Sequence, residues 1–150
     1  MRYETSVMIS RPIEDVWASL VNPFNIPRWN PSWLGIRPAS PTPLGLGSTF
    51  QARMRLFGFE LRLNAEIVDW DPPRGGSFSV RGAIGSGSLR ARLEATEAGT
   101  RLVRGTDIEP RPLLKPLFWI AGPLIRRRSA AYDQQFKRVL EADAPAQGDR

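Results

Sequence analysis

The sequence predicts an α+β domain in which one antiparallel sheet is covered by a long C-terminal helix. Beyond residue 47, apolar and polar residues alternate with a period of two, which is typical of strands with one buried face. From Pro123 to Leu140 the apolar residues instead follow helical spacing. Because the apolar face of such a sheet needs a cover, the C-terminal helix is expected to provide it.

The N-terminal third predicts one strand and two short helices. Tyr3 to Ile9 alternates and is expected to form the first strand. From Pro12 to Leu20 the apolar residues recur at i, i+3, i+4 and i+7, which indicates a helix, with Ser10 placed to cap its first amides. The segment from Asn25 to Trp33 is interrupted by prolines and has room for at most one short helix.

The remaining strands follow a predicted loop at residues 38–47. Gly58 permits a tight hairpin between the first two, and the Asp71-Pro72-Pro73 segment ends the second. In the last strand Leu102 and Val103 are adjacent, so the sequence leaves open which of its residues face the core. The expected strands are 51–57, 59–68, 76–82, 88–95 and 100–108.

Composition limits the chemistry of the chain. With 150 residues, 41% of them hydrophobic, we expect a single domain at residues 1–141 and a flexible tail at 142–150. The absence of cysteine and histidine excludes disulfides, Ser-His-Asp and Cys-His catalysis and the usual zinc ligand sets. We expect no metal site and no cofactor. No long apolar segment occurs in the first 20 residues, so the expected location is cytoplasmic.

The chain is basic, with 21 lysines and arginines against 15 acidic residues and a net charge of +6. Such a surface attracts phosphates in general. The arginines are spread over the strands rather than clustered, so the sequence favours a solvated basic surface over a nucleic-acid site. The oligomeric state is left open.

Several short motifs carry a resemblance to a known family. They are Arg11-Pro12-Ile13-Glu14-Asp15-Val16-Trp17, Trp29-Asn30-Pro31, Gly47-Ser48-Thr49-Phe50, Val68-Asp69-Trp70-Asp71-Pro72-Pro73 and Gly99-Thr100-Arg101-Leu102. With the element order, they resemble the polyketide cyclase/dehydrase branch of the START-like superfamily over residues 3–140. The resemblance implies a helix-grip fold: a curved antiparallel sheet of about seven strands wrapped on a long C-terminal helix, with two short helices after the first strand.

In relatives of this kind a cavity lies between the sheet and the terminal helix. The sheet residues expected to face it carry no charge, which suits an apolar ligand held mainly by burial. The alternative is that these side chains fill the space as an ordinary core. The predicted cavity residues are Trp29, Trp33, Met54, Leu56, Leu61, Leu63, Ile67, Phe78, Val80, Leu89, Leu93, Phe118, Trp119, Ile125 and Tyr132.

The segment from Arg111 to Ile125 allows two interpretations. It is either a lid that touches an anionic membrane surface, or the first part of the covering helix, packed inward with solvated arginines beside it. The residues that would make the membrane contact are Leu117, Phe118, Trp119, Arg126, Arg127 and Arg128.

The resemblance favours a carrier or sensor of a hydrophobic small molecule. One alternative is a cyclase or dehydrase, for which the candidate catalytic set is Tyr132 with Asp107 or Glu109. A further alternative is a toxin-like interaction protein that acts through its basic surface.

Overall fold

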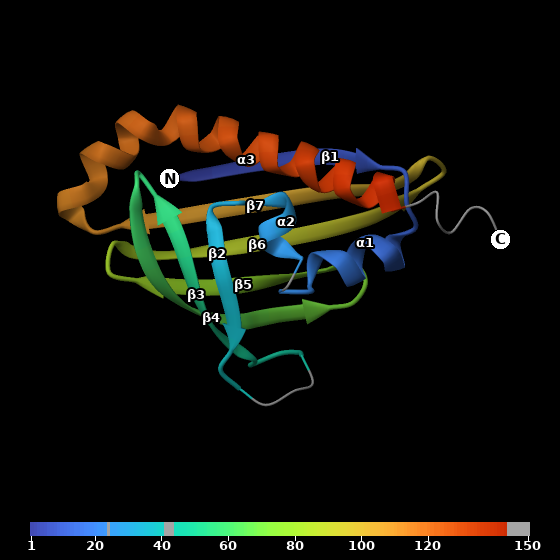
Figure 1. Ribbon diagram of the computed structural model, residues 1–150, viewed down its shortest axis with the longest axis horizontal. Coiled ribbons are helices and arrows are strands. Elements are labelled where there is room, and N and C mark those ends of the chain that lie inside the picture. The colour runs from blue at the N-terminus through green and yellow to red at the C-terminus, as the bar shows by residue number, and fades with distance from the viewer. Residues whose placement is uncertain (24, 41–43, 144–150) are drawn as a thin grey trace.

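The computed structural model describes residues 1–23, 25–40 and 44–143, which form a seven-stranded antiparallel sheet and its helical cover (Figure 1). The strand order is β1-β7-β6-β5-β4-β3-β2, so consecutive strands pair from β2 to β7 and β1 closes the far edge. The strands are β1 (Arg2–Ile9), β2 (Trp33–Pro38), β3 (Thr49–Leu56), β4 (Phe59–Asp71), β5 (Gly75–Gly82), β6 (Gly85–Thr96) and β7 (Gly99–Pro110). This confirms the predicted sheet.

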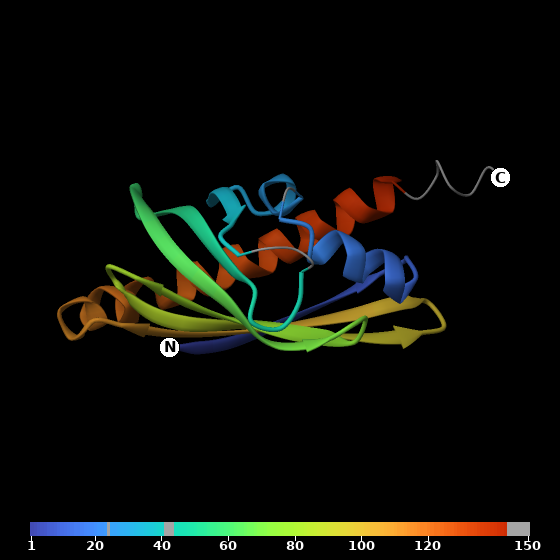
Figure 2. The ribbon, with the colours of Figure 1, turned by 90° about the horizontal axis from the view of Figure 1, so that it is seen from below.

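The sheet is curved, and all helices lie on one side of it. Figure 2 shows the β3–β4 hairpin rising towards the side that carries the helices. Irregular pairing occurs between Trp33 and Gly35 in β2 and between Ile67 and Asp69 in β4. Such bulges bend a strand and increase its twist, so they help the sheet to curve around the helices.

The first helix, α1 (Ile13–Leu20), begins after Pro12, and no side chain caps it. The prediction that Ser10 caps this helix is therefore wrong. The Ser10 backbone N–H donates instead to the carboxylate of Glu141, near the other end of the chain. The short helix α2 (Ile26–Trp29) follows, as the proline spacing predicted.

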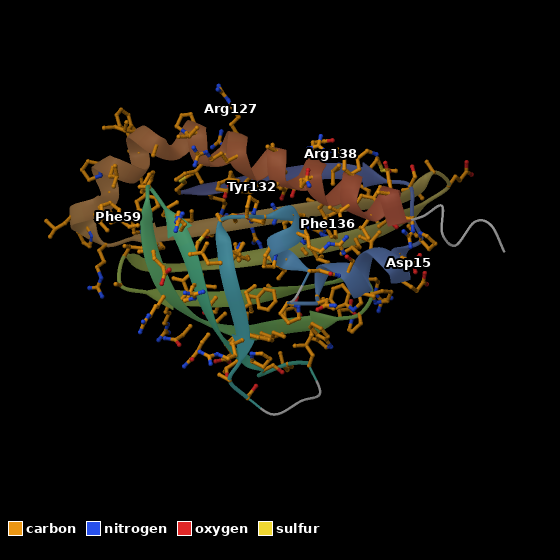
Figure 3. All side chains as sticks on the ribbon, in the orientation of Figure 1. Asp15, Phe59, Arg127, Tyr132, Phe136 and Arg138 are labelled. Carbon is orange, nitrogen blue, oxygen red and sulfur yellow. The ribbon has the colours of Figure 1, made fainter. Side chains whose placement is uncertain are left out.

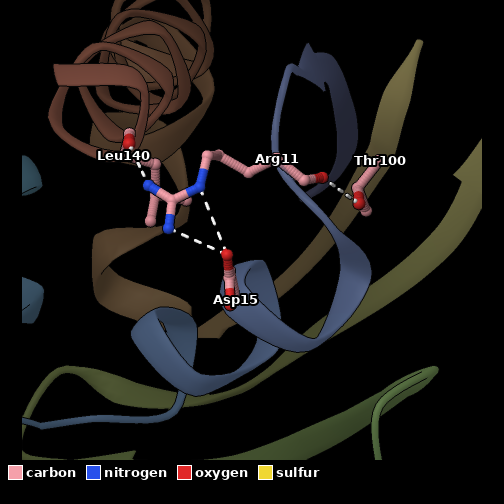
Figure 4. A network of polar contacts seen from close by, with 4 residues as sticks. All are labelled: Arg11, Asp15, Thr100 and Leu140. Atoms are coloured by element: carbon pink, nitrogen blue, oxygen red, sulfur yellow. Dashed lines mark hydrogen bonds and ion pairs between the residues drawn. The ribbon is translucent and has the colours of Figure 1, made fainter. Parts of the chain in front are cut away.

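Arg11 joins three elements at this end of the molecule (Figure 4). Its guanidinium is buried and donates to the Leu140 carbonyl oxygen at 2.7 Å and to Asp15 Oδ2 at 2.8 Å. The Thr100 hydroxyl donates to the Arg11 carbonyl oxygen at 2.8 Å. The motif that begins with Arg11 thus fixes α1 against β7 and the end of the terminal helix.

The terminal helix begins earlier than the sequence indicated. A 3-10 turn, η1 (Pro112–Leu114), leads directly into α3 (Lys115–Asp143), which has Pro123 inside it. The expected start at Pro123 was wrong. Proline is common in the first turn of a helix, so Pro123 was interpreted as the beginning of this one. Inside a helix proline removes one backbone hydrogen bond and causes a bend, and Figure 1 shows α3 changing direction in its first half.

Other boundaries differ by small amounts. The strand β2 was not located from the sequence, because the prolines around it obscure its pattern. The helix α3 continues two residues past the predicted domain end at 141. Of the predicted tail, residues 144–150 lie outside the described residues, as do residues 41–43 of the predicted loop.

The core lies between α3, the two short helices and the β1-β7-β6 part of the sheet. Phe136 of α3 is 1% exposed and packs against Trp29 of α2, with ring centroids 4.9 Å apart. On β7, Leu102 is buried and Val103 is only half-buried, which settles the open question of this strand. By alternation, Arg104, Thr106 and Ile108 then face the same side as Leu102. The buried core cluster is Val7, Ile9, Val16, Trp29, Leu93, Leu102, Phe136 and Leu140.

Candidate ligand-binding cavity

Two adjoining pockets lie between the concave face of the sheet and the helices. The larger has a volume of about 200 Å³ and lies under the first half of α3. The smaller, of about 120 Å³, lies under α1 and α2. Both are lined by Trp33, Val80, Leu89, Arg104 and Thr106, so they meet over the middle of the sheet. Together they form one elongated space with a mainly apolar lining.

Most of the predicted cavity residues line these pockets. Tyr132, Phe118 and Ile125 reach the larger pocket from α3, opposite the sheet residues. Figure 3 labels Tyr132 and Phe136 on the side of α3 that faces the sheet, whereas Arg127 points away from it. The predicted residues around the larger pocket are Trp33, Met54, Leu56, Leu61, Leu63, Val80, Leu89, Phe118, Ile125 and Tyr132, and Trp29 and Phe78 line the smaller one.

Three predicted cavity residues lie elsewhere. Ile67 and Leu93 are 1% and 3% exposed and belong to the packed interior rather than to either pocket lining. Trp119 is 84% exposed. Its neighbour Phe118 points inward, so Trp119 and the next residue, Ile120, lie on the outer side of α3.

A buried ion pair stands at the junction of the pockets. Arg104 Nε of β7 lies 2.5 Å from Asp133 Oδ1 of α3, and the Thr5 hydroxyl donates to the other carboxylate oxygen. The side chain of Asp133 is 3% exposed and that of Arg104 is 19% exposed. The Arg104 guanidinium also lies over the Trp29 ring, 5.1 Å from its centroid. The pair therefore holds a cation at a fixed place in an otherwise apolar space.

The terminal nitrogens of Arg104 remain available to a ligand. No described residue accepts a hydrogen bond from Nη1 or Nη2, while Arg104 lines both pockets. The Trp29 indole Nε1 is buried and likewise has no acceptor within the described ranges. A ligand oxygen placed here would find donors that the protein itself leaves unused.

The candidate catalytic residues are not brought together. Tyr132 is half-buried at the larger pocket, and Asp107 also contributes to the lining of this pocket. Asp107 forms an ion pair with Arg2 at 3.1 Å and lies opposite it in the β1–β7 register. Since Tyr3 is buried beneath α3, Arg2 and Asp107 point to the other face of the sheet. Glu109 is two residues further along the same strand and is exposed, so both carboxylates point away from Tyr132.

Sequence reasoning missed Arg104 and Asp133. A signal for Asp133 existed, because it lies between Tyr132 and Phe136 on the apolar stripe of α3, where a charge requires a partner. Arg104 could not be placed because the facing of β7 was ambiguous. Among the described residues no cluster of acidic side chains is arranged to hold a metal ion.

Comparisons with known proteins place this geometry in a family. The model of the family described as "Polyketide cyclase / dehydrase and lipid transport" matches residues 1–141. No curated protein matches the sequence.

Solved structures share the fold at low sequence identity. A crystal structure from Thermus thermophilus is 14% identical, with a TM-score of 0.80 over 95% of this chain and 99% of that chain. A conserved protein from Geobacillus kaustophilus is 13% identical, with a TM-score of 0.75 over 95% and 96%. Ara h 8.0201 is also 13% identical, with a TM-score of 0.69 over 95% and 98%. With a helix-grip fold and a family match over nearly its whole length, the chain belongs to the polyketide cyclase/dehydrase and lipid transport family of the START-like superfamily.

Proposed function

We propose that the chain binds a small, mainly apolar molecule that carries one carboxylate or carbonyl oxygen, and that Arg104 holds this oxygen. The observation that carries the proposal is the Arg104–Asp133 pair in an apolar cavity. The family description, which includes lipid transport, supports a hydrophobic ligand.

The lining explains why such a ligand would be held. Leucine, methionine and aromatic side chains surround most of the space, so burial of apolar ligand surface supplies affinity at about 25 cal/mol per Å² before entropy losses. The two pockets together reach the lower end of the usual range for small-molecule sites, about 300–1,000 Å³. This size suits a medium-length acyl chain or a small ring system.

The charge explains which end of the ligand would meet Arg104. Asp133 already balances one positive charge, but it occupies only the Nε side of the guanidinium. The two terminal nitrogens match the two oxygens of a carboxylate, the geometry for which arginine is best suited. Arg55 and Arg128 also border the larger pocket, which adds positive potential near its rim.

The geometry does not favour a cyclase or dehydrase. Asp107 and Glu109 point away from Tyr132, and Asp133 is held by Arg104 and Thr5. A general base must reach the proton it abstracts, and none of these carboxylates is free to do so from its described position.

The test is a comparison of dodecanoic acid with its methyl ester by isothermal titration calorimetry. The natural sequence should bind the acid about tenfold more tightly, because only the acid offers a charged oxygen to Arg104. In the double variant Arg104→Met/Asp133→Leu, which replaces the ion pair with apolar groups, the two affinities should become equal.

Arg138→Met is the matched control. Arg138 is an exposed arginine of α3 whose guanidinium donates to Gln135, so its loss should leave the preference for the acid intact. If the double variant keeps the preference, Arg104 is not the anchor. If the natural sequence binds neither compound, the proposed class of ligand is wrong.

A further inference from the structure

The first half of α3 is apolar on nearly every side, yet it is largely exposed. From Lys115 to Ile125 the only charged residue is Lys115. A helix that is apolar all round is normally buried. Here Phe118 is the one buried side chain of this segment, while Trp119 is 84% and Ile120 is 72% exposed. An exposed apolar surface of this kind is typical of an interaction site.

The exposed side chains form one end of the molecule. Leu113, Leu117, Ile120 and Leu124 recur at spacings of four, three and four, which places them along one stripe. Phe57, at the turn of the β3–β4 hairpin, packs edge-on against Phe118, with centroids 5.8 Å apart. Figure 2 shows this hairpin at the same end of the molecule as the start of α3. We name as the apolar end the residues Phe59, Leu113, Leu117, Trp119, Ile120 and Leu124, all exposed.

Basic residues surround the apolar end without acidic partners. Arg111 and Lys115 precede its central helical turns, and Arg126, Arg127 and Arg128 follow them. No aspartate or glutamate occurs between Glu109 and Asp133 in the sequence. In the described part of the chain, none of these five cations forms an ion pair.

We infer that the apolar end docks on the surface of an anionic phospholipid bilayer. The side chains of Trp119, Ile120 and Leu117 would enter the boundary between headgroups and acyl chains, where tryptophan is favoured. Arg126, Arg127 and Arg128 would meet lipid phosphates, each contributing to attraction by a negative surface. No described helix has the length and apolarity needed to cross a bilayer, so the contact is with the surface.

Charge decides between a bilayer and a second copy of the chain. Two copies that met through their apolar ends would bring ten cations together, five from each copy, and the segment between Glu109 and Asp133 offers no acidic residue to balance them. An anionic bilayer offers negative charge around an apolar interior, which complements both features of the surface.

The docking surface adjoins the larger pocket. Leu124 belongs to the apolar end and also lines the larger pocket. Phe118 and Arg128, which are close to the apolar end in the sequence, line this pocket too. A hydrophobic molecule could thus exchange between bilayer and cavity with little exposure to water. This exchange rests on the proposed function, whereas docking itself needs no ligand.

The experiment is flotation of the ligand-free protein with vesicles. The protein should float with vesicles of phosphatidylcholine and phosphatidylglycerol and much less with phosphatidylcholine alone, and high salt should weaken the binding. Trp119→Ser/Ile120→Ser should raise the apparent dissociation constant about tenfold or more, and so should Arg126→Gln/Arg127→Gln/Arg128→Gln. All five positions are exposed, so the melting temperature should stay close to that of the natural sequence.

Leu46→Ser is the matched control, because Leu46 is 70% exposed and belongs to the β2–β3 loop. Figure 1 shows this loop beyond the edge of the sheet opposite α3. It should float like the natural sequence. Flotation that is absent, or unchanged in both sets of variants, would overturn the inference. A concentration-dependent dimer in sedimentation velocity that Trp119→Ser abolishes would also overturn it, by assigning the surface to a second copy. Failure of fatty-acid binding with normal flotation would affect only the proposed function.

Discussion

At the scale of single residues, the Arg104–Asp133 pair is the feature with the largest expected energetic effect. Both side chains lie in a low-dielectric region, and removal of one partner leaves a buried charge without compensation. We expect Arg104→Met and Asp133→Leu each to lower the free energy of unfolding by about 3 kcal/mol. The double variant should recover most of this loss, since replacing both charges with apolar groups is often neutral.

Urea denaturation of the four proteins measures this coupling as a double-mutant cycle. Losses that simply add in the double variant would contradict the ion pair. Thr5→Val serves as a milder probe of the same carboxylate, because it removes one hydrogen bond and leaves both charges in place. Its cost should be about 1 kcal/mol.

Arg104 and Asp133 also show which features of the site could be predicted from the sequence and which could not. The inward facing of Met54, Leu61, Leu63 and Val80 was predictable, because alternation in a strand assigns each residue a face. Arg104 was not, since two adjacent apolar residues left β7 without a clear alternation. The partnership with Asp133 joins positions far apart in the chain, and a local pattern does not report such a pairing.

At the scale of elements, the end of α3 is tied to the end of β1. Glu141 accepts hydrogen bonds from the Ser10 backbone N–H at 2.8 Å and from Lys137 Nζ at 2.9 Å. The Ser10 N–H first, and then Lys137, hold the pKa of Glu141 below its ordinary value of 4.5. Lys137 also donates to the Met8 carbonyl oxygen at 2.7 Å. The end of α3 therefore has two contacts with this region, one through Glu141 and one through Lys137.

This lowered pKa predicts a pH dependence of stability. A carboxyl group whose pKa is lower in the folded state stabilises the fold above the unfolded-state pKa. The contribution is fully present at neutral pH and is lost as the pH falls below about 4.5 and through the lower folded value. Glu141→Gln should therefore lower the free energy of unfolding by about 1 kcal/mol at pH 7 and have little effect at the lowest pH.

Thermal unfolding of both proteins across acidic pH tests this expectation. Glu97→Gln is a suitable control, because Glu97 is exposed at the β6–β7 turn and forms no ion pair with another described residue. If the stability difference between Glu141→Gln and the natural sequence does not shrink as the pH falls, the hydrogen bonds at Glu141 do not stabilise the fold.

Elements were predictable where the chain carries an uninterrupted period. The strands β3 to β7 show alternation and were located within a few residues. The start of α3 was misplaced because Pro123 interrupts the helical pattern, although the helix continues through it. The apolar residues before Pro123 allowed a lid or the first part of the covering helix, and the second interpretation was favoured. These residues do belong to α3, but Phe118 packs inward while Trp119 and Ile120 are exposed, which the sequence pattern did not indicate.

At the scale of the whole molecule, the question is whether the space between the sheet and α3 holds a ligand. A ligand-binding protein needs this space open, whereas an ordinary core would fill it. Ala65 and Ala91 line the smaller pocket, on β4 and β6. A tryptophan at either position would occupy much of a 120 Å³ pocket. Overpacking of this kind costs about 1–3 kcal/mol, so the fold should survive while the site is lost.

The prediction is that Ala65→Trp and Ala91→Trp lose stabilisation by dodecanoic acid. A ligand at one hundred times its dissociation constant stabilises the folded state by about 2.7 kcal/mol, which raises the melting temperature of the natural sequence measurably. In each variant the shift, measured against that variant's own ligand-free melting temperature, should fall close to zero. Ala98→Trp, at the exposed β6–β7 turn, should keep the full shift. An undiminished shift in both Ala65→Trp and Ala91→Trp would mean that the acid binds outside the smaller pocket, because no ligand can share that volume with an indole ring.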